Sequence, residues 1–121
     1  KQKSEGILGI VSPNSWGSDF YRINPKHADY IVTKSKYSSF FQTNLEEILQ
    51  KNQIEHVSVI GTSTHVCVYS TVLDAYQYDY EVVVYKDLVA TRENERTEHN
   101  FALKMMDAKF ATIKKSNTNR I

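Results

Sequence analysis

Short apolar runs alternate with amphipathic stretches along most of this chain. The apolar runs predict four strands, over residues 30–33, 57–60, 81–85 and 110–113. Apolar positions spaced three and four apart predict three helices, over residues 43–52, 66–77 and 93–107. Strands that alternate with helices of this length are typical of βαβ units with right-handed crossovers. We therefore expect an α/β fold built on a mostly parallel sheet, Rossmann-like, with three layers and helices on both faces.

Local signals support these elements. Thr43 followed by Glu46 fits a capping box at the start of the first helix, and Asn52 ends it. The second helix places four residues on one inner face: Val68, Thr71, Val72 and Ala75. The third is expected to turn inward Phe101, Ala102, Met105 and Met106. The continuous β-branched run before Tyr85 predicts burial on both faces of that strand.

Composition and charge narrow the class of protein. The 121 residues suffice for one domain, and 15 basic against 14 acidic residues leave a formal charge of +1. This balance gives no sign of a nucleic-acid or membrane partner. A single cysteine excludes an internal disulfide and a cysteine-based metal finger. The chain shows no apolar run of membrane-spanning length and no signal-peptide pattern, so we expect a cytoplasmic protein without cofactor or metal.

The lone cysteine stands at a chemically suggestive place. The stretch from Gly61 to Cys67 follows the second predicted strand and leads into the second predicted helix. In open parallel sheets, ligands bind beyond the carboxyl ends of the strands. A helix start favours a thiolate, which is the nucleophilic form of cysteine. The alternative is a small buried hydrophobic side chain, which is the commoner environment of a free cysteine.

Two motifs give this chain a resemblance to a known family. The runs over residues 59–75 and 80–87, together with the segment over residues 29–45, resemble the isochorismatase-like cysteine hydrolases. This superfamily includes nicotinamidases and N-carbamoylsarcosine amidases. The resemblance covers residues 14 to 113, and it matches the C-terminal portion of the family's domain.

The resemblance implies a chemistry and the residues that carry it. Cys67 would attack the carbonyl carbon of a small amide, ureido or carbamoyl substrate and form a thioester. Lys34 matches the family's lysine, whose charge favours the thiolate, whereas Lys36 is expected to be a surface residue. The resemblance also implies a cis peptide bond between Thr62 and Ser63, with the backbone amides of Ser63 and Cys67 forming an oxyanion hole.

Other residues are candidates for supporting roles. Tyr37, Phe40 and Trp16 are expected as walls of a substrate pocket, with core packing as the alternative. His65 is expected at the pocket rim or in a structural role, not as the base. Asp74 and Asp87 match acidic positions of the family, and we expect structural hydrogen bonds from them.

One part of the family pattern has no match in this chain. The family's catalytic aspartate follows its first strand, and the apolar run Ile7–Val11 is not followed by such an aspartate. In the family's sheet order, 3-2-1-4-5-6, the four predicted strands would be 3, 4, 5 and 6. We therefore expect residues 1–121 to be a single domain that lacks its N-terminal third, with a polar tail over residues 114–121.

These observations leave alternatives of different classes. The first is a cysteine amidohydrolase, expected as a homo-oligomer, a dimer or tetramer as in the family. The second is a catalytically silent fragment or pseudoenzyme that acts only in assembly. A flavodoxin-like binding module ranks last, because no glycine-rich phosphate loop is present.

Overall fold

The structure is a computed structural model, and it describes residues 14–117. Its contacts divide the chain into two compact units, Lys1–Ile31 and Val32–Ile121. We describe each unit by itself. The N-terminal apolar run Ile7–Val11 and the last residues of the predicted tail lie outside the described residues.

The described part of the first unit consists of turns. A short 3-10 turn, η1 (Trp16–Ser18), is closed by hydrogen bonds from the amide and hydroxyl of Ser18 to the carbonyl of Ser15. A second turn joins Lys26 and Asp29 through hydrogen bonds between the two residues. The predicted strand over residues 30–33 is wrong, since these residues are not in a strand. A lone extended segment has no neighbour to complete a hydrogen-bonded ladder.

The second unit contains a parallel sheet, as predicted. Its strands are β1 (His56–Thr62), β2 (Glu81–Ala90) and β3 (Thr112–Lys114), in the order β1-β2-β3. Both neighbouring pairs run parallel. The strands predicted over residues 57–60, 81–85 and 110–113 are thus confirmed, although β2 is longer and β3 begins two residues later than expected.

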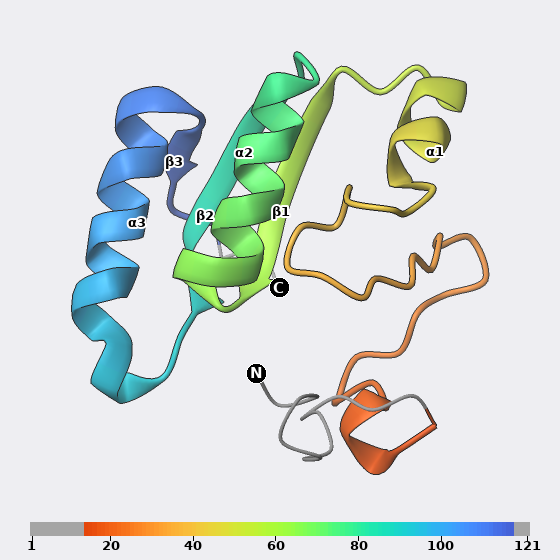
Figure 1. Ribbon diagram of the computed structural model, residues 1–121, viewed down its shortest axis with the longest axis horizontal. Coiled ribbons are helices and arrows are strands. Elements are labelled where there is room, and N and C mark those ends of the chain that lie inside the picture. The colour runs from red at the N-terminus through yellow and green to blue at the C-terminus, as the bar shows by residue number, and fades with distance from the viewer. Residues whose placement is uncertain (1–13, 118–121) are drawn as a thin grey trace. The chain divides into compact units, whose positions relative to one another are not determined.

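Helices connect these strands. A short helix, α1 (Leu45–Lys51), precedes β1 and ends before Asn52 as predicted. A π-helical turn, η2 (Thr64–Val68), leads into α2 (Tyr69–Gln77), and a 3-10 turn, η3 (Glu93–Glu95), leads into α3 (Arg96–Lys109). Figure 1 shows α2 in front of β1 and β2, with α3 on the same side near β3. None of the helices in residues 14–117 is long and apolar enough to cross a membrane.

The core lies between these two helices and β2. The predicted inner face of α2 is confirmed, because Val68, Thr71, Val72 and Ala75 are all buried. Ala102 and Met106 of α3 are buried as well, but Phe101 is 63% exposed, so its predicted inward position is wrong. Phe101 directly precedes Ala102, and a helical step of about 100° per residue turns it away from the face that Ala102 and Met106 share.

The central strand is buried on one face only. Burial alternates along β2: Val82 and Val84 are buried, whereas Val83 and Tyr85 are half-buried. The prediction of burial on both faces is therefore wrong for this strand. Side chains alternate along a strand, and α2 and α3 cover the face to which Val82 and Val84 point.

The predicted capping box at α1 forms only in part. The hydroxyl of Thr43 accepts a hydrogen bond from the amide of Leu45 at 3.2 Å. Glu46 does not turn back to the helix start. Its carboxylate accepts hydrogen bonds from the phenol of Tyr80 at 2.9 Å and from the side chain of Gln50 at 2.7 Å. The tertiary contact with Tyr80 is available only in the folded chain, which is why the local pattern does not predict it.

A bulge interrupts the ladder between β1 and β2. Val59 pairs with Val84, but the next pair along β1 joins Gly61 to Val89. The extra residues of β2 include Asp87, whose carboxylate accepts hydrogen bonds from the amide and the hydroxyl of Ser116. The predicted polar tail is thus ordered at its start, where Lys114 belongs to β3 and Ser116 is anchored to β2.

Candidate functional site

The site begins at the turn that ends β1. Gly61 has a φ of +126°, a backbone conformation that side chains with a Cβ rarely adopt. The following peptide bond, Thr62–Ser63, is cis. This is the bond for which the resemblance implied a cis conformation.

Cys67 lies in the π-helical turn that follows. The carbonyl of Ser63 accepts hydrogen bonds from the amides of Val66 at 3.1 Å and Val68 at 3.2 Å, which hold this turn closed. The Cys67 side chain is half-buried. It is a free thiol in the turn that leads into α2, beyond the carboxyl end of β1, which agrees with the place that the sequence predicts. Short π-helical turns of this kind often occur at functional sites.

Side chains from the β2–α3 connection and from α3 support this turn. Thr64 is fully buried, and its hydroxyl lies 2.8 Å from Nδ1 of His99 on α3. The hydroxyl of Thr91 lies 3.4 Å from Nδ1 of His65 and donates a hydrogen bond to Glu95 at 3.0 Å. These contacts connect both residues at the start of η2 to residues that follow β2. Sequence periodicity does not predict these contacts, because they join residues 26 and 35 positions apart.

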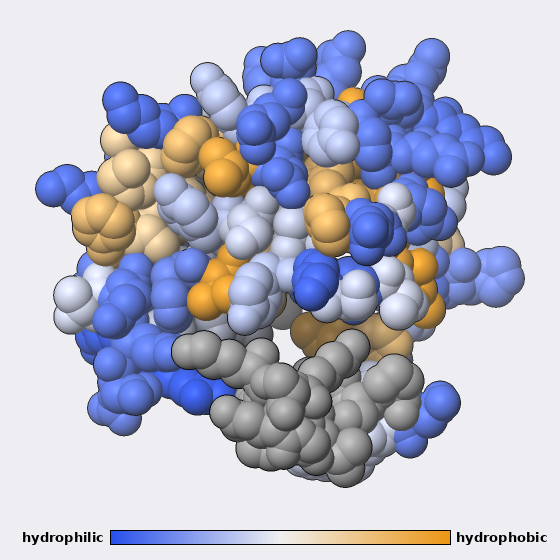
Figure 2. Space-filling view, in the orientation of Figure 1, coloured by the Kyte–Doolittle hydropathy of each residue, from blue (hydrophilic) through white to orange (hydrophobic). Residues whose placement is uncertain are grey.

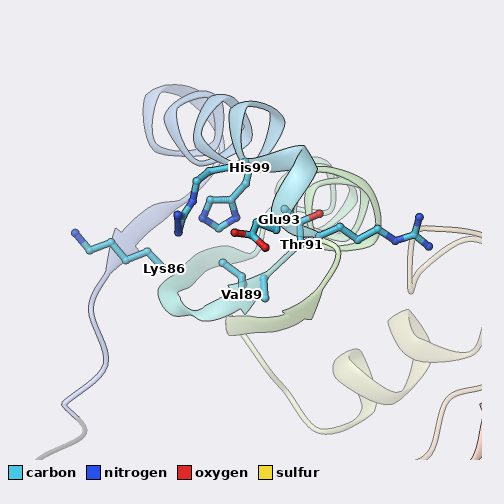
Figure 3. Close-up of a pocket in the computed structure, with 8 residues that line it drawn as sticks. Lys86, Val89, Thr91, Glu93 and His99 are labelled. Carbon is cyan, nitrogen blue, oxygen red and sulfur yellow. The ribbon is translucent and has the colours of Figure 1, made fainter.

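A pocket of about 430 Å³ adjoins this network at the carboxyl end of β2. In Figure 3, Glu93 and His99 point into it, and Thr91 lies at its edge. Three cationic side chains also line the pocket, Lys86, Arg92 and Arg96, against the single carboxylate of Glu93. The lining is therefore positively charged, and Cys67 is not part of it.

Lys34 lies in a segment without helix or strand. Its ammonium group donates hydrogen bonds to the carbonyls of Lys36 at 2.6 Å and Tyr37 at 3.0 Å, so the side chain folds back over its own turn. The residue is exposed. An ammonium group has three donors, and these two bonds leave one for a further partner.

The chain that follows Lys34 is attached to α2. The hydroxyl of Ser38 donates to a carboxylate oxygen of Asp74 at 2.5 Å, and the amide of Ser39 donates to the hydroxyl of Thr71 at 3.0 Å. Ser38 and Thr71 are both buried. Asp74 thus has the structural hydrogen bond expected of it. Sequence reasoning included Ser38 and Ser39 only within the segment over residues 29–45 and missed their contacts with α2.

The expected pocket walls lie in different places. Phe40 is buried in the core, with its ring centroid 5.3 Å from that of Tyr78 and 6.2 Å from that of Tyr80. Both tyrosines lie between the end of α2 and the start of β2, away from the carboxyl edge that carries Cys67. Phe40 therefore packs in the core, and it also lines a pocket beside Asp74 and Tyr78, so its role as a wall of a substrate pocket stays a prediction. Burial and ring stacking follow from its position beside the attached Ser38 and Ser39.

The other three candidates are less buried. Tyr37 is 65% exposed and contributes its carbonyl to Lys34. His65 lines an apolar groove of about 450 Å³ together with Tyr69 and Phe101. Trp16 belongs to the first unit, where it is 90% exposed. A role in a substrate pocket stays a prediction for these three residues.

Two residues outside this region have shifted pKa values. Burial, followed by the hydrogen bond to Glu46 and its charge, raises the pKa of Tyr80 to about 12. The hydrogen bonds from the side chain and backbone of Ser116 lower the pKa of Asp87. Both groups have a structural contact that explains the shift, and Asp87 thus has the backbone hydrogen bond expected of it. No three potential metal ligands gather at one place within residues 14–117.

Known proteins are similar to this chain in sequence. The protein-family model of the isochorismatase domain matches residues 3–118 of this sequence. The isochorismatase family protein YaaI of Bacillus subtilis is 37% identical over 86 residues, which are 71% of this chain and 46% of that protein. The ureidoacrylate amidohydrolase RutB of Yersinia enterocolitica is 38% identical over 88 residues, which are 71% of this chain and 38% of that protein.

A solved structure agrees with the sequence relatives. The N-carbamoylsarcosine amidase of Thermoplasma acidophilum superposes with a TM-score of 0.82 and 30% identity, over 96% of this chain and 64% of that chain. The chain thus spans less than half the length of the two sequence relatives and under two thirds of this solved structure. The matching domain and the parallel sheet lead to one conclusion: this chain belongs to the isochorismatase family.

Proposed function

We propose that Cys67 is the nucleophile of a hydrolase that cleaves a C–N bond in a small amide, ureido or carbamoyl substrate. One observation carries the proposal: a free, half-buried thiol lies in a π-helical turn directly after the carboxyl end of β1 and the cis bond Thr62–Ser63. Family membership supports the choice of substrate class, since two relatives of this chain are named a ureidoacrylate amidohydrolase and an N-carbamoylsarcosine amidase.

The proposed reaction has two steps. In the first, the Cys67 sulfur attacks the carbonyl carbon, the C–N bond breaks, and the nitrogen leaves with a proton as ammonia or an amine. In the second, water attacks the thioester carbon, which releases the acid and restores the thiol. The backbone amides of Ser63 and Cys67 are the proposed donors to the oxyanion of both steps. Lys34 is the proposed cation that favours the thiolate.

The proton acceptor is the part of this mechanism without a candidate. The resemblance assigns it to an aspartate of a segment that no residue of this chain matches. The specific substrate, a homo-oligomeric state and a cytoplasmic location also stay predictions. The alternative, a catalytically silent protein that acts only in assembly, differs from the hydrolase in one measurable property, the chemistry of Cys67.

Turnover and thioester formation test the proposal together. We expect a protein that contains these residues together with the family's aspartate to release ammonia from at least one member of a panel of primary amides, ureido acids and N-carbamoyl amino acids. Intact mass spectrometry should detect the acyl group on Cys67. The Cys67→Ala variant should lose at least about 10³-fold in kcat, because the covalent route is closed.

A matched pair of lysine variants provides the control. Lys34→Ala should lower kcat/KM, whereas Lys36→Ala, which removes an exposed side chain two residues away, should leave it unchanged. If no substrate yields ammonia above the Cys67→Ala background and Cys67 is no more reactive toward iodoacetamide than a free thiol, the silent alternative holds.

A further inference from the structure

Lys34 belongs to a segment whose backbone no ladder or helix supports. Residues 32–43 contain neither helix nor strand, and Figure 1 draws them as a plain trace before α1. The lysine holds only its own turn, through the carbonyls of Lys36 and Tyr37. The contacts that position this turn against the rest of the second unit must therefore come from the residues that follow it.

Two serines supply that attachment, and both bind to the helix that follows Cys67. The hydroxyl of Ser38 donates to Asp74 at 2.5 Å, and it accepts from the amide of Phe40 at 3.2 Å. The amide of Ser39 donates to Thr71 at 3.0 Å, and the Thr71 hydroxyl donates back to that of Ser39 at 3.2 Å. We name Ser38, Ser39, Thr71 and Asp74 the serine latch.

Lys34 and Cys67 lie at the same distance along the sequence from the latch residue that follows each of them. Lys34 precedes Ser38 by four residues, and Cys67 precedes Thr71 by four. On the helical side, four residues correspond to about 6 Å of rise, so Cys67 lies one turn from the latch. The Lys34 turn ends directly at Ser38. The latch therefore joins the lysine turn directly to the helix that follows Cys67.

The composition of the latch favours a positioning role. Ser38 and Thr71 are buried, with 7% and 8% of their surface exposed, and Asp74 is half-buried. Burying polar groups is costly unless they are hydrogen-bonded, and an apolar pair would stabilise the contact at least as well. Directional hydrogen bonds, unlike apolar contacts, define the orientation of the attached segment.

We propose that the serine latch positions Lys34 relative to Cys67, with Asp74 and Ser38 as positioning residues. This inference rests on the proposed function, in which Lys34 favours the Cys67 thiolate. It makes the reactivity of the thiol depend on two side chains that touch neither the thiol nor a substrate.

Alkylation of Cys67 by iodoacetamide over a pH series tests this inference without requiring turnover. The single cysteine makes the readout unambiguous. We expect Ser38→Ala and Asp74→Ala to shift the midpoint of the alkylation profile upward by about one pH unit, as Lys34→Met does. At neutral pH this corresponds to alkylation about tenfold slower. The double variant Lys34→Met/Ser38→Ala should shift no further than either single variant.

The direction in which Asp74→Ala shifts the midpoint of the alkylation profile distinguishes a positioning role from loss of charge and from a purely structural role. Loss of a nearby negative charge would by itself favour the thiolate and lower the midpoint. A purely structural role would lower the melting temperature and leave the midpoint in place. Asp74→Asn keeps an acceptor for Ser38, so it should retain a midpoint near that of the wild type. Ser35→Ala, in the same segment and exposed, is the matched control and should also retain it.

Each outcome has a distinct meaning. If Lys34→Met shifts the midpoint but Ser38→Ala and Asp74→Ala do not, the latch inference is overturned and the proposed function stands. If Lys34→Met leaves the midpoint unchanged, the pairing of Lys34 with Cys67 is itself wrong. If one latch variant fails to fold, as judged by circular dichroism, the other carries the test.

Discussion

Side-chain hydroxyls provide most of the long-range hydrogen bonds around Cys67. Thr64 contacts His99, Thr91 contacts His65, and the serine latch attaches the lysine segment to α2. Each hydroxyl is both a donor and an acceptor, so a single residue can satisfy two partners where space is limited. The turn around Cys67 is thereby connected to residues before β1 and after β2.

At the same scale, Tyr80 should titrate far later than an ordinary tyrosine. Burial and the carboxylate of Glu46 raise its pKa from 10.0 to about 12. The folded state therefore favours the neutral phenol. Its contribution to stability is fully present below pH 10.0 and is lost as the pH rises through about 12.

We expect Glu46→Gln to lower the pKa of Tyr80, because it removes the negative charge and leaves burial alone. Ultraviolet difference titration of the wild type, of this variant and of Tyr80→Phe measures the effect, with circular dichroism at each pH to exclude unfolding. An unchanged late step in Tyr80→Phe would contradict the assignment.

Elements of this fold differ in how they are fixed. The helix α3 is held by the side chains that it buries, whereas the bulge in β2 is held by polar contacts with the segment after β3. The two kinds of contact predict different responses to substitution and to pH.

For α3, substitutions at two large apolar residues should lower the free energy of unfolding by very different amounts. Met106 is fully buried, so Met106→Ala should lower the free energy of unfolding by about 2–5 kcal/mol. Phe101→Ser, at an exposed position, should change it by no more than about 0.5 kcal/mol. Urea denaturation of both variants measures the difference. A large loss of stability in Phe101→Ser would mean that this side chain is covered in solution.

For the bulge in β2, the hydrogen bonds from Ser116 lower the pKa of Asp87. The ionised carboxylate therefore stabilises the fold above the ordinary aspartate pKa, and this contribution is lost as the pH falls through the folded value.

We expect Ser116→Ala to raise the Asp87 pKa toward its ordinary range, measured by NMR titration of the carboxyl carbon. Lys115→Met, which removes only the weaker charge effect, is the control and should raise it less. An equal rise in both variants would show that charge, not hydrogen bonding, lowers the pKa.

For the whole second unit, the layering explains the exposure of the sheet. Both crossover helices lie on one face, so the hydrophobic core forms there and the opposite side of β2 stays half-buried. Within residues 14–117, the strand β1 pairs with β2 alone, and none of its residues is fully buried. At the exposed starts of these two strands, Nδ1 of His56 lies 2.8 Å from a carboxylate oxygen of Glu81. On the face seen in Figure 2, hydrophobic residues form separate patches among hydrophilic ones.

The sequence by itself determined the β1-to-β3 part of the fold and the place of Cys67. Local periodicity marked these strands and helices, because burial against a sheet requires apolar positions at regular spacing. Alternation of the two element types then implied parallel strands, and the residues of the turn and of the lysine segment indicated the family. None of this reasoning needed a contact between distant residues.

Only the tertiary structure decided how these elements contact one another. Phe40 lies in the core, Phe101 faces outward, and Glu46 binds Tyr80 instead of its own helix end. The serine latch and the contact between His99 and Thr64 likewise join residues more than 30 positions apart. Such contacts depend on which faces the chain brings together, and a local pattern of hydrophobic and polar residues contains no information about that pairing.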